Sequence, residues 1–303
     1  YLFATNRGLA RVFESTVAAG IGRTQLTFWN EAKLAVFCKT GIRQYLSLAL
    51  PGIIIISEWW ASEITIFLSG RMAPSPDLAL DGMTIYQSIN TFCFMFPMGC
   101  AIAGAARVGN SLGAGDTAGA EFSAKISVTS AAILSTMMGT ILYVTPHSFI
   151  PSFFSPDEEV VAEASKTIPF LCFYLFADGV QVALNGVVKG CGRQCITMPV
   201  VVVAYWFVGV PFAYYLAFVR HNGEMYCDEG KLCGIAGLVF GMTTGTWVHM
   251  LLLLFIVVCT TNWRVLARQA KERLFEGNTK EHEMSALTTI GRDEAIEMGL
   301  TRL

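Results

Sequence analysis

Six long apolar stretches constrain the fold of this chain more than any other feature of its sequence. A helix needs about 20 mostly apolar residues to cross the hydrocarbon core of a bilayer, and each stretch is at least that long. The stretches are residues 46–70, 83–106, 126–147, 167–188, 197–219 and 234–261. Since a helix in lipid satisfies its own backbone hydrogen bonds, the sequence predicts an all-α, polytopic membrane protein with six transmembrane helices.

The composition supports a membrane protein and argues against a nucleic-acid partner. Hydrophobic residues make up 53% of the chain and charged residues only 15%, whereas an average soluble domain has about 25% charged residues. The mean hydropathy is +0.52. The net charge of −2 lacks the basic excess that binds nucleic acid, so membrane lipid is the expected surrounding.

The distribution of Lys and Arg predicts the topology. They gather before the first stretch and after the second, fourth and sixth, whereas the opposite loops contain few of them and more acidic residues. Cytoplasmic loops carry the excess of basic residues, so both termini are expected in the cytoplasm, at the plasma membrane or a vacuolar membrane. The predicted organisation is a basic, amphipathic linker at 1–41, a six-helix transmembrane lobe at 42–263 and a cytoplasmic tail at 264–303.

Three carboxylates interrupt the apolar stretches. Glu58 lies twelve residues from either end of its stretch, roughly 18 Å from each membrane boundary, and Asp178 is similarly central. A charge at that depth is costly and usually functional, and apolar surroundings favour the neutral form of a carboxyl group. We therefore expect both residues to exchange a proton near neutral pH. Glu63 follows Glu58 by five positions, about 140° around the helix, so it faces elsewhere and is the weaker candidate.

Polar residues accompany Asp178 on its helix. Tyr174, Gln181 and Asn185 stand at i−4, i+3 and i+7, so they share its helix face. This pattern predicts a polar cavity wall that contacts a substrate. The alternative is that these groups only hydrogen-bond neighbouring helices, a common use of polar residues in membranes.

Trp59 and Trp60 lie beside Glu58, far from a membrane interface. Aromatic rings bind organic cations, so both are candidates for substrate binding, with plain packing as the alternative. His249 is a lone histidine on the last stretch. The sequence favours a hydrogen-bonded packing role for it, and titration of its imidazole is the alternative.

The nine cysteines carry no metal signature. Cys191 and Cys195 are not a CxxC pair and lack neighbouring histidines, so no zinc site is expected there. Cys227 and Cys233 flank a loop that the charge pattern places outside, where oxidation occurs. A disulfide between them is one of two open alternatives.

Three ordered motifs resemble the C-terminal half of the multidrug and toxic compound extrusion (MATE) family. They are SEWWASEITIFLSG at 57–70, FPMGCAIAGAARVGNSLGAGD at 96–116 and ADGVQVALNGVVKGCGRQ at 177–194. The resemblance covers most of residues 42–263 and is closest to the eukaryotic branch. Animal members carry an acid nine residues before the proline matching Pro97, whereas this chain has Ser88 there, which favours a plant-like pattern.

The resemblance implies one six-helix lobe of a secondary antiporter with two lobes around a central cleft. In the family, the acids that match Glu58 and Asp178 bind the coupling cation and the substrate, and Glu63 matches a second acid on the same helix. The implied substrate is an organic cation, xenobiotic or amphiphilic metabolite, exchanged for protons or, alternatively, for Na⁺. No other cofactor is implied, and the expected partner is an N-terminal lobe.

Three alternatives stay open beside antiport. A lipid-linked precursor flippase of the same superfamily would favour basic residues in its cavity, and no stretch has Lys or Arg near its centre. A membrane hydrolase would need an acid, base and nucleophile set, which is not evident, so no enzyme activity is expected. The chain opens at Tyr1 and shows no signal-peptide pattern, which leaves a truncated, non-transporting fragment as the third alternative.

Overall fold

The computed structural model describes residues 39–227 and 232–272. The sequence predictions for residues 1–38 and 273–303, most of the linker and tail, lie outside the described residues. The chain divides into two compact units, residues 1–50 and 51–303. All contacts reported below lie within the second unit.

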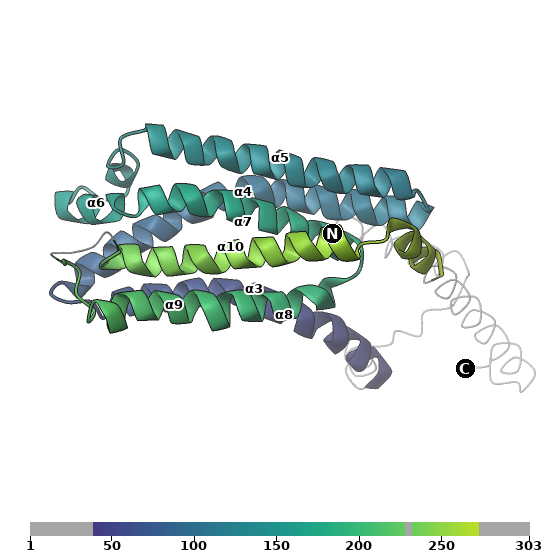
Figure 1. The fold of residues 1–303 in the computed structure, drawn as a ribbon, viewed down its shortest axis with the longest axis horizontal. Coiled ribbons are helices and arrows are strands. Elements are labelled where there is room, and N and C mark those ends of the chain that lie inside the picture. Colours follow the sequence, from purple (N-terminus) through teal and green to yellow (C-terminus); the bar gives the residue numbers. More distant parts are fainter. Residues whose placement is uncertain (1–38, 228–231, 273–303) are drawn as a thin grey trace, which may run out of the picture. The chain divides into compact units, whose positions relative to one another are not determined.

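Helices build the described part of the chain, in which no β-strand occurs (Figure 1). The longer helices are α3 (Lys39–Ser69), α4 (Pro76–Ala114), α5 (Thr117–Val144), α7 (Ile168–Gly190) and α10 (Ile235–Thr260). Shorter elements are η1 (Pro151–Phe153), α6 (Glu158–Ser165), η2 (Gln194–Ile196), α8 (Thr197–Val201), η3 (Val202–Gly209), α9 (Val210–Tyr214) and η4 (Tyr215–Arg220). A helical segment at 263–272 follows α10.

The six predicted membrane spans are confirmed by length and composition. The candidate spans are Ala49–Ser69, Pro76–Ala114, Thr117–Val144, Ile168–Gly190, Gln194–Arg220 and Ile235–Thr260. The second span begins earlier and ends later than the apolar stretch predicts, and the third begins earlier. Hydropathy marks only the part of a helix that meets lipid, whereas these helices continue into more polar sequence.

Two residues suffice to connect α4 and α5. Gly115 ends α4 with φ of 78°, a left-handed conformation that costs glycine little. The next residue, Asp116, caps α5 by accepting a hydrogen bond of 2.9 Å from the Gly119 backbone N–H. This tight joint makes α4 and α5 antiparallel neighbours.

The fifth span departs from a regular α-helix. Its backbone passes from α8 into the π-helical η3, returns to α-helix in α9 and widens again in the π-helical η4. Pro211 lies at the start of α9 and has no N–H to donate to the preceding turn, so the widened η3 stretch precedes the residue that interrupts the hydrogen-bond ladder. Tyr205 is carried by this stretch.

Helix α7 occupies the centre of the second unit. It packs against α4, α5 and α10, and 83% of its span is buried, compared with 28–39% for the other five spans. These neighbours surround α7 in Figure 1. A residue in the middle of α7 is therefore shielded from lipid.

Glycines let the backbones of α7 and α4 approach each other. A Cβ added to Gly186 would overlap the carbonyl oxygen of Ala101, and one added to Gly190 would lie 2.7 Å from the carbonyl oxygen of Ala105. Small residues at such contacts are typical of helix pairs in membranes. The close contact fixes the rotation of α7 and thereby the direction of its polar face.

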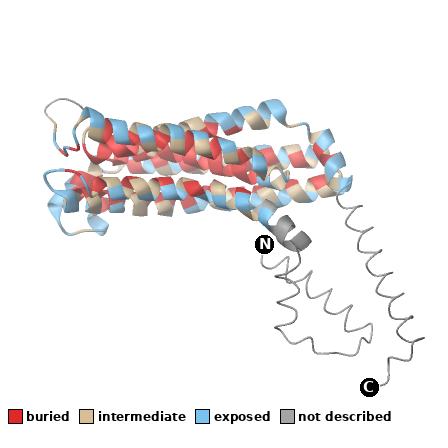
Figure 2. Ribbon diagram, turned by 90° about the horizontal axis from the view of Figure 1, so that it is seen from below, coloured by how far each residue is buried: buried red, intermediate tan, exposed pale blue. Residues whose placement is uncertain are grey.

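The outward surface of the second unit is largely apolar. Large hydrophobic side chains such as Phe67, Phe207 and Val258 are 71–75% exposed, and Figure 2 shows exposed residues along the outer faces of helices whose inner faces are buried. Lipid tails provide the apolar surroundings that such side chains require.

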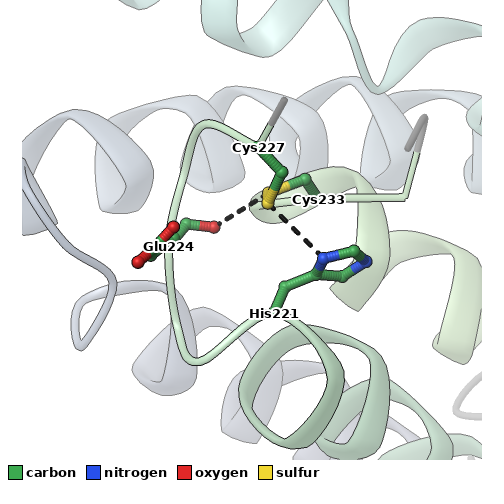
Figure 3. Close-up of a disulfide and its surroundings, with 4 residues drawn as sticks. All are labelled: His221, Glu224, Cys227 and Cys233. Atoms are coloured by element: carbon green, nitrogen blue, oxygen red, sulfur yellow. Dashed lines mark hydrogen bonds between the residues drawn. A yellow bond between two sulfur atoms is a disulfide. The ribbon is translucent and has the colours of Figure 1, made fainter. Parts of the chain in front are cut away.

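A disulfide joins Cys227 to Cys233 in the connection between η4 and α10 (Figure 3). His221 Nδ1 lies 3.5 Å from the Cys227 sulfur, and the Glu224 carbonyl oxygen lies 3.1 Å from the Cys233 sulfur. The sequence left this pairing open, and the structure decides for the disulfide.

Gly186→Ala tests the contact between α7 and α4. The added methyl group meets backbone that cannot rotate away, so we expect the free energy of unfolding to fall by about 1–3 kcal/mol, measured by thermal unfolding in detergent. Gly99→Ala is the matched control, because no atom lies within 4 Å of a Cβ there. Equal stability of the two variants would contradict the packing.

Removal of the disulfide tests its contribution to stability. The cysteines are separated by 6 positions, and the chain-entropy model gives about 2 kcal/mol for a loop of this size. We expect Cys227→Ser combined with Cys233→Ser to lower the free energy of unfolding by that amount. Cys195→Ser, which removes an exposed free cysteine, should leave stability unchanged. A reductant should lower the stability of the wild-type chain but not that of the double variant.

Candidate functional site

Asp178 lies in the middle of α7 and is only 3% exposed. The Tyr174 hydroxyl donates a hydrogen bond to Asp178 Oδ1 over 3.5 Å, and Gln181 Nε2 donates to the same oxygen over 3.2 Å. Asn185 Nδ2 in turn donates to Gln181 Oε1 over 3.0 Å. The polar helix face predicted from the spacing is confirmed, and it forms a continuous hydrogen-bonded chain.

Glu58 approaches the same region from α3. Its side chain is 13% exposed, and its Oε2 lies 3.6 Å from Nδ1 of His249 on α10. Neither atom has a hydrogen-bond partner among the described residues. The sequence favoured a hydrogen-bonded packing role for His249, and the structure contradicts the hydrogen bond because both ring nitrogens are unpaired.

One cavity brings Glu58 and Asp178 together. The residues that line it come from α3, α4, α7 and η3: Glu58, Trp59, Ser62, Gln87, Asn90, Thr91, Phe94, Tyr174, Asp178 and Tyr205. Its volume is about 30 Å³, which is enough for one or two water molecules. Glu58 and Asp178, distant in sequence, therefore face one small space.

The charged residues that line the cavity are both acidic. Two carboxylates line the cavity, and its described lining includes no Lys or Arg. Burying unpaired negative charge is strongly unfavourable, so protonation or a bound cation would stabilise the pair. The Asn90 side-chain oxygen is buried without a hydrogen-bond partner and adds a further acceptor.

The remaining candidates from the sequence lie at different distances from this cavity. Trp59 lines it, and its ring meets Phe94 edge to face with centroids 5.6 Å apart. Trp60 is 52% exposed and Glu63 is exposed, and neither lines the cavity. Gln181 and Asn185, predicted as part of the cavity wall, do not line the cavity: Gln181 donates to Asp178, and Asn185 donates to Gln181.

Several cavity residues were missed by the sequence analysis. Gln87 and Asn90 on α4 and Tyr205 on η3 line the cavity, and none of them is an acid. Asn90 offered a signal, because a buried amide in an apolar stretch needs a partner. Tyr205 offered no such signal, because tyrosine is common in membrane helices. It lies on the π-helical η3, whose backbone the sequence analysis did not anticipate.

The disulfide loop does not form a metal site in this structure. His221, Cys227 and Cys233 lie close enough to hold an ion, but both sulfurs are bonded to each other. Zinc binds the thiolate form of cysteine, which a disulfide lacks. The disulfide therefore forms a covalent cross-link within the loop that precedes α10.

Comparison with known proteins identifies relatives across most of the chain. The family model MatE matches residues 51–215, more than half of the chain. Protein DETOXIFICATION 10 of Arabidopsis thaliana is 31% identical over 85% of this chain and 50% of its own length. Multidrug and toxin extrusion protein 1 of Danio rerio is 30% identical over 75% of this chain and 36% of its own length.

A solved structure agrees with these relatives. The crystal structure of the eukaryotic MATE transporter AtDTX14 superposes with a TM-score of 0.68 at 28% identity, and the match covers 80% of this chain and 54% of that one. The chain thus spans about half the length of the relatives it matches. The six spans, the ordered motifs and these matches lead to one conclusion: the chain belongs to the MatE family of multidrug and toxic compound extrusion proteins.

Proposed function

We propose that this chain supplies one six-helix lobe, the C-terminal one, of a secondary antiporter that exports organic cations in exchange for protons. Support comes from the family membership and from relatives named for detoxification and for multidrug and toxin extrusion. The match covers 50% of the first relative's length and 36% of the second's. The other lobe would come from a segment or partner equivalent to the unmatched half.

The shared cavity is the observation on which the proposal rests. Glu58 on α3 and Asp178 on α7 face the same space without a basic residue in the described lining. A cation that neutralises the pair makes the site less attractive to a second cation. Competition between a proton and a substrate for the same negative charge couples their fluxes, because each shifts the population of conformations it binds best.

The size of the cavity separates two roles. A volume of about 30 Å³ has room for a small ion or water. In our proposal the carboxylates take the coupling ion there, and the substrate contacts the half-exposed Trp59 at the cavity wall. Tyr174 lines the cavity beside Asp178. Gln181 supports Asp178 by a hydrogen bond, and Asn185 in turn donates a hydrogen bond to Gln181.

Transport without bond cleavage fits this site better than its rivals. A flippase for pyrophosphate-linked lipids would need basic groups facing the substrate, and the described lining residues are acidic, amide, hydroxyl or aromatic. The relatives are named for detoxification and for multidrug and toxin extrusion rather than for bond cleavage. We propose no enzymatic activity.

We also propose an orientation with both termini in the cytoplasm, at the plasma membrane or a vacuolar membrane. The excess of Lys and Arg in alternate loops supports it. The disulfide lies in a loop that this orientation places away from the cytosol, where disulfides persist.

Asp178→Asn and Glu58→Gln test the proposed function. The chain, coexpressed with a matching N-terminal lobe, is reconstituted into liposomes, and exchange of a fluorescent organic cation is driven by an imposed proton gradient. We expect either substitution to reduce exchange to the level of empty liposomes, because a neutral amide cannot release a proton.

Glu121→Gln is the control for this assay, since Glu121 is a half-exposed carboxylate paired with Lys125 on α5. Glu63→Gln shows whether the exposed acid on α3 contributes. A Na⁺ gradient replaces the proton gradient in a parallel series. Proton-driven exchange that survives Asp178→Asn would contradict the proposal, as would exchange driven only by Na⁺.

Gln181→Leu tests the support of Asp178. The substitution removes the closer of two donors to Asp178 Oδ1, and an unsatisfied buried acceptor costs about 1–3 kcal/mol. We expect lower thermal stability and slower exchange. Asn185→Leu, an equal change one turn further along α7 without a hydrogen bond to Asp178, should affect exchange less. A reversed order of the two variants would argue against the hydrogen-bonded chain.

A further inference from the structure

We propose that His249 on α10 is the proton partner of Glu58 on α3, and that the two side chains hold one proton between them inside the bundle. The proposal rests on the proposed proton-coupled function and adds a residue outside the pair of carboxylates. His249 is fully buried, with 0% of its side chain exposed.

The geometry of the pair supports a shared proton. His249 Nδ1 and Glu58 Oε2 are 3.6 Å apart, and both are buried atoms without another partner among the described residues. An approach of about 0.5 Å brings them into normal hydrogen-bond range. A single proton on either atom would then satisfy both Nδ1 and Oε2.

The aromatic surroundings hold the imidazole in place. The Tyr205 ring stands nearly perpendicular to it, at 85° and with centroids 5.5 Å apart. The Tyr205 hydroxyl is engaged with the Thr246 hydroxyl over 3.2 Å. Tyr205 therefore packs against His249 while its own polar group is already satisfied.

Other titratable groups near the pair have partners or do not exchange protons near neutral pH. They are Tyr86 on α4, Tyr174 and Asp178 on α7 and Tyr205 on η3. Tyrosine hydroxyls titrate near pH 10 in water, and Asp178 receives hydrogen bonds from Tyr174 and Gln181. His249 Nδ1 lies 3.6 Å from Glu58 Oε2, and neither atom has another partner among the described residues.

His249 places a second proton-binding atom, the ring Nδ1, directly beside the Glu58 carboxylate, with no water molecule needed between them. When Glu58 holds the proton, both groups are neutral, and the unprotonated Nδ1 accepts a hydrogen bond from the carboxyl group. Transfer of that proton to Nδ1 would leave a carboxylate on α3 beside an imidazolium on α10. His249 in this scheme positions and neutralises Glu58, while Glu58 faces the cavity.

The experiment follows both members of the pair by spectroscopy in the full chain, reconstituted with the same N-terminal lobe as the transport assay. The carboxyl C=O infrared band that Glu58→Gln removes reports Glu58. The ¹⁵N signals of the imidazole that His249→Gln removes report His249. Both are recorded across a pH series for the wild-type chain and each variant.

We expect reciprocal coupling. Removal of His249 should move the titration midpoint of Glu58 by at least about one pH unit, a tenfold change in proton affinity. Removal of Glu58 should move the midpoint of His249 by the same amount, because linkage between two sites is symmetric. Thr243→Val, which alters another buried polar residue of α10 that bonds within its own helix, should move neither.

Unchanged midpoints in both variants would overturn the proposal. If His249→Gln fails to fold, the imidazole signals of His249 in the Glu58→Gln variant test the proposal by themselves. A histidine not coupled to Glu58 would titrate in that variant as it does in the wild-type chain. Reciprocal shifts in a protein that does not exchange protons for cations would support the pair and reject the proposed function. Proton-coupled exchange without these shifts would reject the pair and leave the function standing.

Discussion

Hydrocarbon offers no hydrogen bonds, and this constraint organises the whole structure. Backbone groups must pair within helices, so the spans of the described chain are helical even where Pro211 interrupts the regular ladder. Side chains separate in the same way: large apolar residues such as Phe67 and Val258 face outward, and polar groups gather inside. Asp178 can exist in this setting only because α7 is enclosed by α4, α5 and α10.

The close packing of α7 against α4 and the position of the polar side chains of α7 depend on each other. Gly186 and Gly190 allow the backbone of α4 to approach, and this contact sets the rotation of α7. The rotation directs Asp178 toward the cavity, and Gln181 continues the hydrogen-bonded chain inside the bundle. A larger residue at either glycine would therefore disturb both packing and the direction of the carboxylate.

The candidate site joins groups that only the folded bundle brings together. Glu58 and Asp178 face one small cavity from two helices, and His249 reaches Glu58 from a third. Such a cluster of acidic and imidazole groups suits the exchange of a small cation. Membership of the MatE family and a match to half the length of an Arabidopsis relative support the antiporter lobe proposed above.

The sequence by itself determined the six spans, the family resemblance and the polar face of α7, because hydropathy, motif order and spacing along one helix are local properties. It also indicated that Glu58 and Glu63 face different directions, since five positions are about 140° of a helix. The tertiary structure decided which of the two lines the cavity, and it brought in Asn90, Tyr205 and His249. Contacts between helices depend on how their side-chain surfaces fit together. The π-helical stretches and the glycine contacts influence this fit, and neither produces a periodic pattern that can be read from the sequence.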